Sequence, residues 1–206
     1  IIAGEASGDL HGSKLVSALK ARLPKARFTG MGGTRMQEAG VDTLFGIERM
    51  GAVGIVEVLG DFDHYYKVYR TLMREIASRR YDAVILIDYP TLNLRLAKQG
   101  KRFNCPVFYF ISPQVWAWRK GRIRDIRDSV NKMFVILPFE EKMYLDAGVD
   151  AEFLGHPFVD LVYPSRTREE SSIKYSLNPA IKTIGLGPGS RMNEVNSLLE
   201  VMIQAA

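Results

Sequence analysis

Asp88 is the residue that the sequence places best for acid–base chemistry. It ends the apolar run Ala83–Asp88 and is followed at once by Tyr89 and Pro90. An apolar strand would deliver its carboxylate to one edge of a sheet, and the proline would force an abrupt exit from that strand. A carboxylate there acts as a general base if a substrate hydroxyl lies within hydrogen-bonding reach. A helix N-cap or a hydrogen bond to a nearby loop explains such an aspartate equally well, so the pattern alone leaves both interpretations open.

A glycine-containing turn, Ala3–Asp9, lies near the start of the chain. Its glycines permit a tight turn and a close approach to a ligand, and Ser7 or Asp9 can cap a following helix whose N–H groups face a cleft. Neither phosphate-binding pattern fits: the dinucleotide pattern needs G-x-G-x-x-G, and the P-loop needs a lysine after its last glycine, whereas Gly8 is followed by an aspartate. A plain capped turn is the alternative. The ligand-binding interpretation involves Gly4, Glu5, Ser7, Gly8 and Asp9.

Ser112 follows a third apolar run, Val107–Ile111, and is a further candidate for substrate binding. Two tryptophans and a basic segment follow it, and spacings of three and four put Lys120, Arg124 and Arg127 on one helix face. Such a face can bind a sugar phosphate or contact anionic lipid headgroups. For these basic residues we prefer the alternative, in which the tryptophans are buried in the core and the basic side chains form a solvated helix face.

Two glycine-rich stretches suggest further contacts. Gly185–Arg191 precedes an expected helix, and its glycines, hydroxyl and guanidinium favour an anion cradle. The phosphate candidates there are Gly189, Ser190 and Arg191. Met50–Gly60 is apolar and glycine-studded; it is either a buried helix or a surface for acyl chains and membrane. The candidates for that contact are Val53, Ile55, Val56, Val58 and Leu59.

Length and composition limit the fold class and the kinds of partner that the chain can have. The chain has 206 residues, 47% of them hydrophobic and 25% charged, which suits one α/β domain and part of another. The single cysteine, Cys105, excludes an internal disulfide. The net charge of +5 favours anionic partners, but no nucleic-acid-binding signature accompanies it. His156 lacks partners at metal-ligand spacing, so we predict no metal, and no apolar run reaches the ~18 residues of a membrane span.

Short apolar runs alternate with amphipathic segments. The predicted strands are Ile1–Ala3, Arg27–Gly30, Ala83–Asp88, Val107–Ile111, Lys132–Leu137, Glu152–Gly155 and Thr183–Gly187. The predicted helices are Gly8–Leu23, Thr34–Ala39, Asp61–Arg79, Leu92–Gly100, Val115–Ser129, Phe139–Ala147 and Asn193–Gln204. Strands that are apolar throughout indicate a parallel sheet buried on both faces. The strand–helix–strand order predicts an α/β, doubly wound, Rossmann-like sheet, whose ligands gather beyond the carboxyl ends of the strands.

The polar, proline-bounded stretch Pro164–Pro179 marks a connection between domains. We therefore predict a first domain at 1–163, a connection at 164–179, and the start of a second Rossmann-like domain at 180–206. The chain opens inside a strand and ends inside a helix, so we expect it to be part of a longer protein.

Eight stretches, in this order, resemble the lipid-A-disaccharide synthase family. They are AGEASGD (Ala3–Asp9), GMGG (Gly30–Gly33), GIVEVLG (Gly54–Gly60), IDYP (Ile87–Pro90) with a following Asn93, SPQVWAWR (Ser112–Arg119), LPFE (Leu137–Glu140), LGHP (Leu154–Pro157) and PGSRMNEV (Pro188–Val195). They run along nearly the whole chain and cover about the first half of a typical member. Thr91 and Gly187 depart from the aspartate and leucine that the family usually has there.

The resemblance implies an inverting glycosyltransferase with two Rossmann-like domains, the GT-B architecture. Such enzymes join UDP-2,3-diacylglucosamine to 2,3-diacylglucosamine 1-phosphate, giving UDP and the β-1,6-linked lipid A disaccharide. Asp88 would be the general base, Gly189, Ser190 and Arg191 would hold the UDP phosphates, and the glycine turn with Ser112 would line the acceptor side. The family needs no cofactor and attaches peripherally to the cytoplasmic face of the inner membrane of Gram-negative bacteria.

Two alternatives remain open from the residues. One is another GT-B sugar-nucleotide enzyme, such as a UDP-N-acetylglucosamine 2-epimerase, although a wholly soluble substrate would not require the apolar stretch after Met50. The other is a non-catalytic sugar-nucleotide or lipid-binding module. The sequence leaves homo-oligomerisation open, and we expect these 206 residues alone to be inactive as a transferase.

Overall fold

The structure is a computed structural model that describes residues 1–48, 50, 62–118, 121–178, 180–189 and 192–206. The described chain divides into two compact units, Ile1–Leu161 and Val162–Ala206. The first unit contains a parallel sheet and the helices that cover it. The second contains two helices joined by extended chain.

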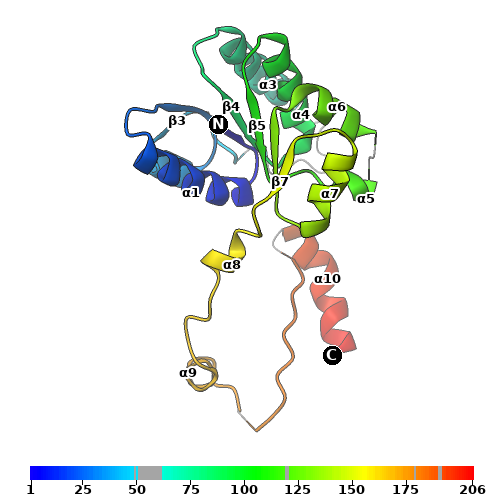
Figure 1. Cartoon of the computed structure of the whole chain (residues 1–206). Coiled ribbons are helices and arrows are strands. Elements are labelled where there is room, and N and C mark those ends of the chain that lie inside the picture. Colours follow the sequence, from blue (N-terminus) through cyan, green and yellow to red (C-terminus); the bar gives the residue numbers. More distant parts are fainter. Residues whose placement is uncertain (49, 51–61, 119–120, 179, 190–191) are drawn as a thin grey trace. The chain divides into compact units, whose positions relative to one another are not determined.

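The described strands of the first unit form one seven-stranded sheet in the order β3-β2-β1-β4-β5-β6-β7 (Figure 1). All six neighbouring pairs run parallel. The strands are β1 (Ile2–Ala3), β2 (Phe28–Met31), β3 (Val41–Phe45), β4 (Val84–Ile87), β5 (Val107–Phe110), β6 (Lys132–Val135) and β7 (Ala151–Phe153). The chain winds outward in one direction from β1 and in the other from β4. This confirms the predicted Rossmann-like, doubly wound fold.

Helices cover both faces of this sheet. They are α1 (Ala6–Arg22), α2 (Thr34–Glu38), α3 (Phe62–Ala77), α4 (Pro90–Arg102), α5 (Val115–Trp118), α6 (Arg122–Ser129), α7 (Pro138–Asp146) and α8 (Phe158–Leu161). Successive side chains of β4 point to opposite faces, so Leu86 joins a core cluster with α3, α4 and α6, while Ile87 joins one with α1 and α2. Burial on both faces explains why the strand is apolar throughout.

Two details of the first unit differ from the sequence prediction. Strand β3 was not predicted, because its residues alternate between buried or half-buried and exposed instead of forming a continuous apolar run. That alternation is typical of an edge strand with one solvated face. The single helix predicted at Val115–Ser129 is described as two helices, α5 and α6, and residues 119–120 lie outside the described residues.

The second unit contains α9 (Arg168–Lys174) and α10 (Met192–Ala205). Helix α9 lies within the stretch predicted as a bare connection. Thr167 accepts a hydrogen bond from the Glu170 amide, and Glu170 accepts one from the Thr167 amide, which together form a capping box. The strand predicted at Thr183–Gly187 is wrong: these residues have no neighbouring strand among the described residues, and a strand forms only by pairing.

Candidate active site at the carboxyl edge of the sheet

Gly4 and Asp88 are neighbours at the point where the strand order reverses. The last aligned pair of β1 and β4 is Ala3 with Ile87, so the next residue of each strand is Gly4 and Asp88. From there β1 leads into α1 on one face of the sheet, and β4 leads into α4 on the other. Diverging connections of this kind open a crevice at the carboxyl edge, which is where doubly wound sheets bind ligands. The fold therefore brings together two motifs that lie more than eighty residues apart.

The backbone at Asp88 turns sharply into α4. Asp88 and Tyr89 have φ values of 42° and 46°, so two successive non-glycine residues are left-handed. Such a conformation costs roughly 1–2 kcal/mol per residue and persists only where the surroundings impose it. The Asp88 amide donates to the Phe110 carbonyl of β5 at 3.1 Å. The turn leaves Asp88 half-buried, between the buried end of β4 and the start of α4.

Two buried side chains hold the main-chain carbonyl of Asp88. The hydroxyl of Tyr109 on β5 donates to it at 2.6 Å, and the side-chain amide of Asn93 on α4 donates to it at 2.8 Å. Asn93 also donates to the carbonyl of Ile87 at 3.1 Å. Tyr109 and Asn93 are both fully buried. The exit from β4 is thus tied to the next strand and to the following helix.

The glycine turn packs against the ring of Tyr89. A Cβ atom at Gly4 would lie 2.7 Å from Cε1 of this ring and closer still to other ring atoms, so only glycine fits. Gly8 in α1 packs against β1, where an added Cβ would lie 3.1 Å from the Cβ of Ala3. Glu5 is half-buried, and Ser7 is exposed in the first turn of α1.

Asp9 does not cap its own helix, as the sequence suggested it could. Helix α1 begins at Ala6, earlier than predicted, and no side chain caps it. The buried carboxylate of Asp9 instead accepts hydrogen bonds from the amides of Gly33 at 2.8 Å, Arg35 at 3.2 Å and Met36 at 3.0 Å. It therefore caps α2, whose first amides have no partner within that helix. The capping prediction was wrong because the free amides of α2 lie beside this residue.

Ser112 lies just beyond the end of β5, the strand next to β4. It is 5% exposed, and its hydroxyl lies beside that of Tyr144 without forming a well-aligned hydrogen bond to the described protein residues. A buried hydroxyl without a partner is costly, and such groups commonly mark a ligand or a water. Ser112 therefore fits the position predicted for it at the carboxyl edge.

The chain is similar to known proteins along its whole length. The family model described as lipid-A-disaccharide synthetase matches residues 1–206, which is the whole chain. The chain belongs to the lipid-A-disaccharide synthetase family. A lipid-A-disaccharide synthase from Syntrophus aciditrophicus is 48% identical over 206 residues, covering 100% of this chain and 54% of that protein. One from Geobacter metallireducens is 47% identical, with the same coverage. The resemblance seen in the sequence is thereby confirmed.

The chain spans about half the length of the curated relatives that it matches. The described residues include the candidate base, Asp88, and the acceptor-side candidates. Gly189 lies in the second unit with a φ of 117°, and a Cβ there would lie 2.8 Å from the Cβ of Glu194. The remaining candidates lie outside the described residues: Ser190, Arg191, Val53, Ile55, Val56, Val58 and Leu59.

Sequence reasoning on this family member missed three residues that shape the site: Tyr89, Asn93 and Tyr109. One signal was present, because a tyrosine in an apolar strand needs a partner for its hydroxyl when it is buried. Nothing in the sequence indicates that the partner is the carbonyl of Asp88, because that contact depends on the register of β4 and β5. Burial raises the pKa of Tyr109 well above its usual value, and the negative charge of Asp88 acts in the same direction.

His156 follows β7 and forms part of an aromatic cluster. Its ring lies 5.1 Å from that of Phe158, which lies 5.3 Å from the ring of His11 on α1. Nδ1 of His156 accepts a hydrogen bond from the Phe158 amide at 3.2 Å. Burial lowers the pKa of His11, and the charge of His156 lowers it further. The cluster ties the chain after β7 to α1.

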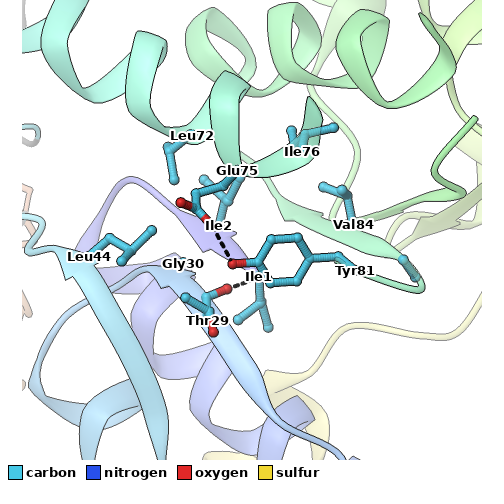
Figure 2. A pocket seen from close by; sticks show the side chains of 11 residues that line it. Ile1, Ile2, Thr29, Gly30, Leu44, Leu72, Glu75, Ile76, Tyr81 and Val84 are labelled. Atoms are coloured by element: carbon cyan, nitrogen blue, oxygen red, sulfur yellow. Dashed lines mark hydrogen bonds between the residues drawn. The ribbon is translucent and has the colours of Figure 1, made fainter. Parts of the chain in front are cut away.

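A pocket lies at the opposite, amino edge of the sheet (Figure 2). Residues at the start of β1 and β4, including Ile2 and Val84, line it together with α3. The Tyr81 hydroxyl donates to Glu75 there at 2.7 Å. Because the carboxyl ends of β1 and β4 carry Gly4 and Asp88, this pocket is not part of the candidate active site.

The described residues show neither a metal-binding cluster nor a membrane-spanning helix. They contain no group of three or more histidine, cysteine, aspartate or glutamate side chains arranged to hold a metal ion. Among the helices that these residues form, none combines the length and the apolar character required to cross a bilayer.

Proposed function

We propose that the full-length protein containing this chain transfers 2,3-diacylglucosamine from UDP to 2,3-diacylglucosamine 1-phosphate. The products are UDP and the β-1,6-linked disaccharide 1-phosphate that precedes lipid A. The observation that carries the proposal is the position of Asp88, a half-buried aspartate after β4 at the switch point of a doubly wound sheet. Membership in the lipid-A-disaccharide synthetase family favours this transfer over an epimerase or a non-catalytic module.

In the proposed reaction, Asp88 is the general base. Its carboxylate takes the proton from the 6-hydroxyl of the acceptor while that oxygen attacks the anomeric carbon of the donor. The bond between this carbon and the diphosphate oxygen breaks, and UDP leaves with the electron pair. Attack from the face opposite the leaving group inverts the anomeric carbon and gives the β linkage.

The acceptor side is formed, in this proposal, by the segments next to Asp88. Gly4 and Glu5 come from the turn after β1, Ser7 and Gly8 from the first turn of α1, and Ser112 offers a buried hydroxyl after β5. Asp9 contributes by capping α2, since its carboxylate already accepts three amide hydrogen bonds. These groups would orient the acceptor so that its 6-hydroxyl meets the base.

The donor and acyl sides involve the remaining candidates. We propose that Gly189, Ser190 and Arg191 hold the UDP phosphates and stabilise the charge of the leaving group. We also propose that 1–163 is the acceptor domain, 164–179 the connection, and 180–206 the start of the donor domain. The stretch with Val53, Ile55, Val56, Val58 and Leu59 would contact acyl chains and the inner membrane surface, to which the enzyme attaches peripherally.

The test uses the full-length protein with both lipid substrates. The wild-type enzyme should release UDP and form the disaccharide, and Asp88→Asn should lower kcat by about 10²–10⁴-fold while the protein remains folded. Asp82→Asn is the matched control, because Asp82 is an exposed aspartate just before the other end of β4. It should keep nearly full turnover. Near-normal turnover by Asp88→Asn would remove the base from the mechanism, and no disaccharide from the wild type would refute the function.

A further inference from the structure

The carbonyl group of Asp88 is held more tightly than the end of a strand requires. In the sheet, the Asp88 amide donates to Phe110, as ladder hydrogen bonding demands. The carbonyl instead accepts two side-chain hydrogen bonds, from Tyr109 at 2.6 Å and from Asn93 at 2.8 Å. These donors approach from different elements, β5 and α4. Together they fix the orientation of the peptide plane after Asp88.

The orientation of that peptide determines where the carboxylate lies. Asp88 and Tyr89 are both left-handed, with φ values of 42° and 46°. Relaxing these residues to the usual right-handed or extended regions would swing the Asp88 carbonyl away from its two donors and redirect the Cα–Cβ bond. The two hydrogen bonds therefore oppose relaxation of the left-handed turn. A general base works only if its oxygen stays within hydrogen-bonding reach of the substrate hydroxyl.

We propose that Tyr109 and Asn93 are positioning residues that act on the acceptor-activating step through the Asp88 carbonyl. This inference rests on the proposed role of Asp88 as the base. Both side chains are fully buried, and the Tyr109 hydroxyl and the Asn93 side-chain N–H group already donate to the Asp88 carbonyl. Their contribution is geometric: they keep the base in its reactive position before the acceptor arrives, so that no reorganisation is needed during proton transfer.

Tyr109 suits this role in a further respect. Burial raises the pKa of its hydroxyl well above the usual value, so the group stays protonated and remains a donor throughout the range in which a carboxylate base works. Asn93 has no titratable group and donates at every pH. Both hydrogen bonds to the Asp88 carbonyl should therefore persist over the pH range of the assay.

The central experiment measures kcat and KM of the full-length enzyme carrying Tyr109→Phe. This variant keeps the buried ring and removes only the hydroxyl. We expect kcat to fall by about 10- to 100-fold, because a small displacement of a reacting group has effects of that size. KM for both lipid substrates should stay close to the wild-type values, since no substrate contact is lost. Asn93→Ala should give the same pattern by removing the second donor.

Tyr81→Phe is the matched control. Tyr81 is half-buried at the opposite, amino edge of the sheet, and its hydroxyl donates to Glu75 at 2.7 Å. Each variant loses one tyrosine hydroxyl and its hydrogen bond, so the unfolding temperature should fall in both, but Tyr81→Phe should keep its kcat. If both variants lose kcat to the same extent, the effect of Tyr109 is one of general stability and the inference is wrong.

A double-mutant cycle separates this inference from the proposed function. In the Asp88→Asn background, measured with excess enzyme over long incubations, Tyr109→Phe should have no further effect, because the base that it positions is gone. An equal loss in both backgrounds overturns the positioning role. A wild-type kcat in Tyr109→Phe, together with an inactive Asp88→Asn, also overturns it and leaves the proposed base intact. Full activity of Asp88→Asn refutes the base itself.

Discussion

Gly4 lies directly against the aromatic ring of Tyr89. A Cβ atom at residue 4 would approach Cε1 of the ring to 2.7 Å and other ring atoms more closely, well inside van der Waals contact. Tyr89 cannot easily move away, because its backbone is left-handed and its hydroxyl donates to the Met50 carbonyl at 3.2 Å. The turn after β1 and the turn after β4 therefore form one interlocked unit around Asp88.

Gly4→Ala should disturb this unit and the base together. The added methyl group must displace the Tyr89 ring, and overpacking of this kind costs typically about 1–3 kcal/mol. Because Asp88 precedes Tyr89, we expect kcat of the full-length enzyme to fall by at least about 10-fold. Unfolding temperature and steady-state kinetics measure the two effects.

Two further variants control this prediction. Gly121→Ala should be nearly neutral, because a Cβ there meets nothing within 4 Å. In a Tyr89→Ala background, Gly4→Ala should cost less stability than it does in the wild type, because the ring that clashes is absent. If Gly4→Ala is as stable and active as Gly121→Ala, the two turns are not interlocked.

The sequence was sufficient to predict the fold class and the edge of the sheet where the candidates lie. Continuous apolar strands alternating with helices indicate a doubly wound sheet, and Asp88 stands at the end of such a strand. What sequence periodicity could not provide is the register between strands. The placement of Gly4 beside Asp88 and the hydrogen bond from Tyr109 depend on that register.

Other differences have equally local causes. The alternating edge strand Val41–Phe45 lacks the continuous apolar pattern that revealed the other strands. Asp9 was expected to cap its own helix, but the choice between two neighbouring helix ends is made by tertiary contacts. Helix α9 was detectable, because Thr167 and Glu170 have the spacing of a capping box.

Asp9→Asn should destabilise the protein. The carboxylate accepts three amide hydrogen bonds at the start of α2, and an asparagine offers only one acceptor oxygen and no charge. We expect a loss of about 1–3 kcal/mol in the free energy of unfolding, measured by urea denaturation. Asp42→Asn is the control, because Asp42 is an exposed aspartate on neighbouring β3. Equal losses for both variants would show that the cap contributes nothing specific.

Ser112→Ala should separate binding from stability. Its buried hydroxyl neighbours that of Tyr144 but forms no well-aligned hydrogen bond to the described protein residues, so its removal should change the unfolding temperature little. If the hydroxyl binds the acceptor, KM for the acceptor should rise by about 5- to 20-fold, the usual value of one hydrogen bond.

Ser129→Ala gives the converse pattern. Ser129 is equally buried, but its hydroxyl donates to the carbonyl of Asp125. Its removal should lower the unfolding temperature and leave KM for the acceptor unchanged. An unchanged KM in Ser112→Ala would exclude Ser112 from the acceptor site.

Tyr89 should make the protein less stable in alkali. Burial is the main reason that the pKa of Tyr89 rises from 10.0 to about 12, and the charges of Tyr65 and Glu5 add to the shift. In the unfolded chain the hydroxyl ionises near its ordinary pKa, so between these values the unfolded state binds fewer protons than the folded state. The stabilisation is therefore complete below about pH 10 and is lost as the pH rises towards 12.

Tyr89→Phe removes this ionisation and provides the comparison. The free energy of unfolding of the full-length protein, measured with urea, should fall less steeply with pH in the variant than in the wild type. The two slopes should differ by up to about 1.4 kcal/mol per pH unit. Below the ordinary tyrosine pKa, the two proteins should have parallel pH profiles, offset only by the lost hydrogen bond to Met50. Profiles that stay parallel throughout the alkaline range would show that Tyr89 ionises as readily in the folded protein as in the unfolded chain. In that case the hydroxyl is not buried in the interlocked unit around Asp88.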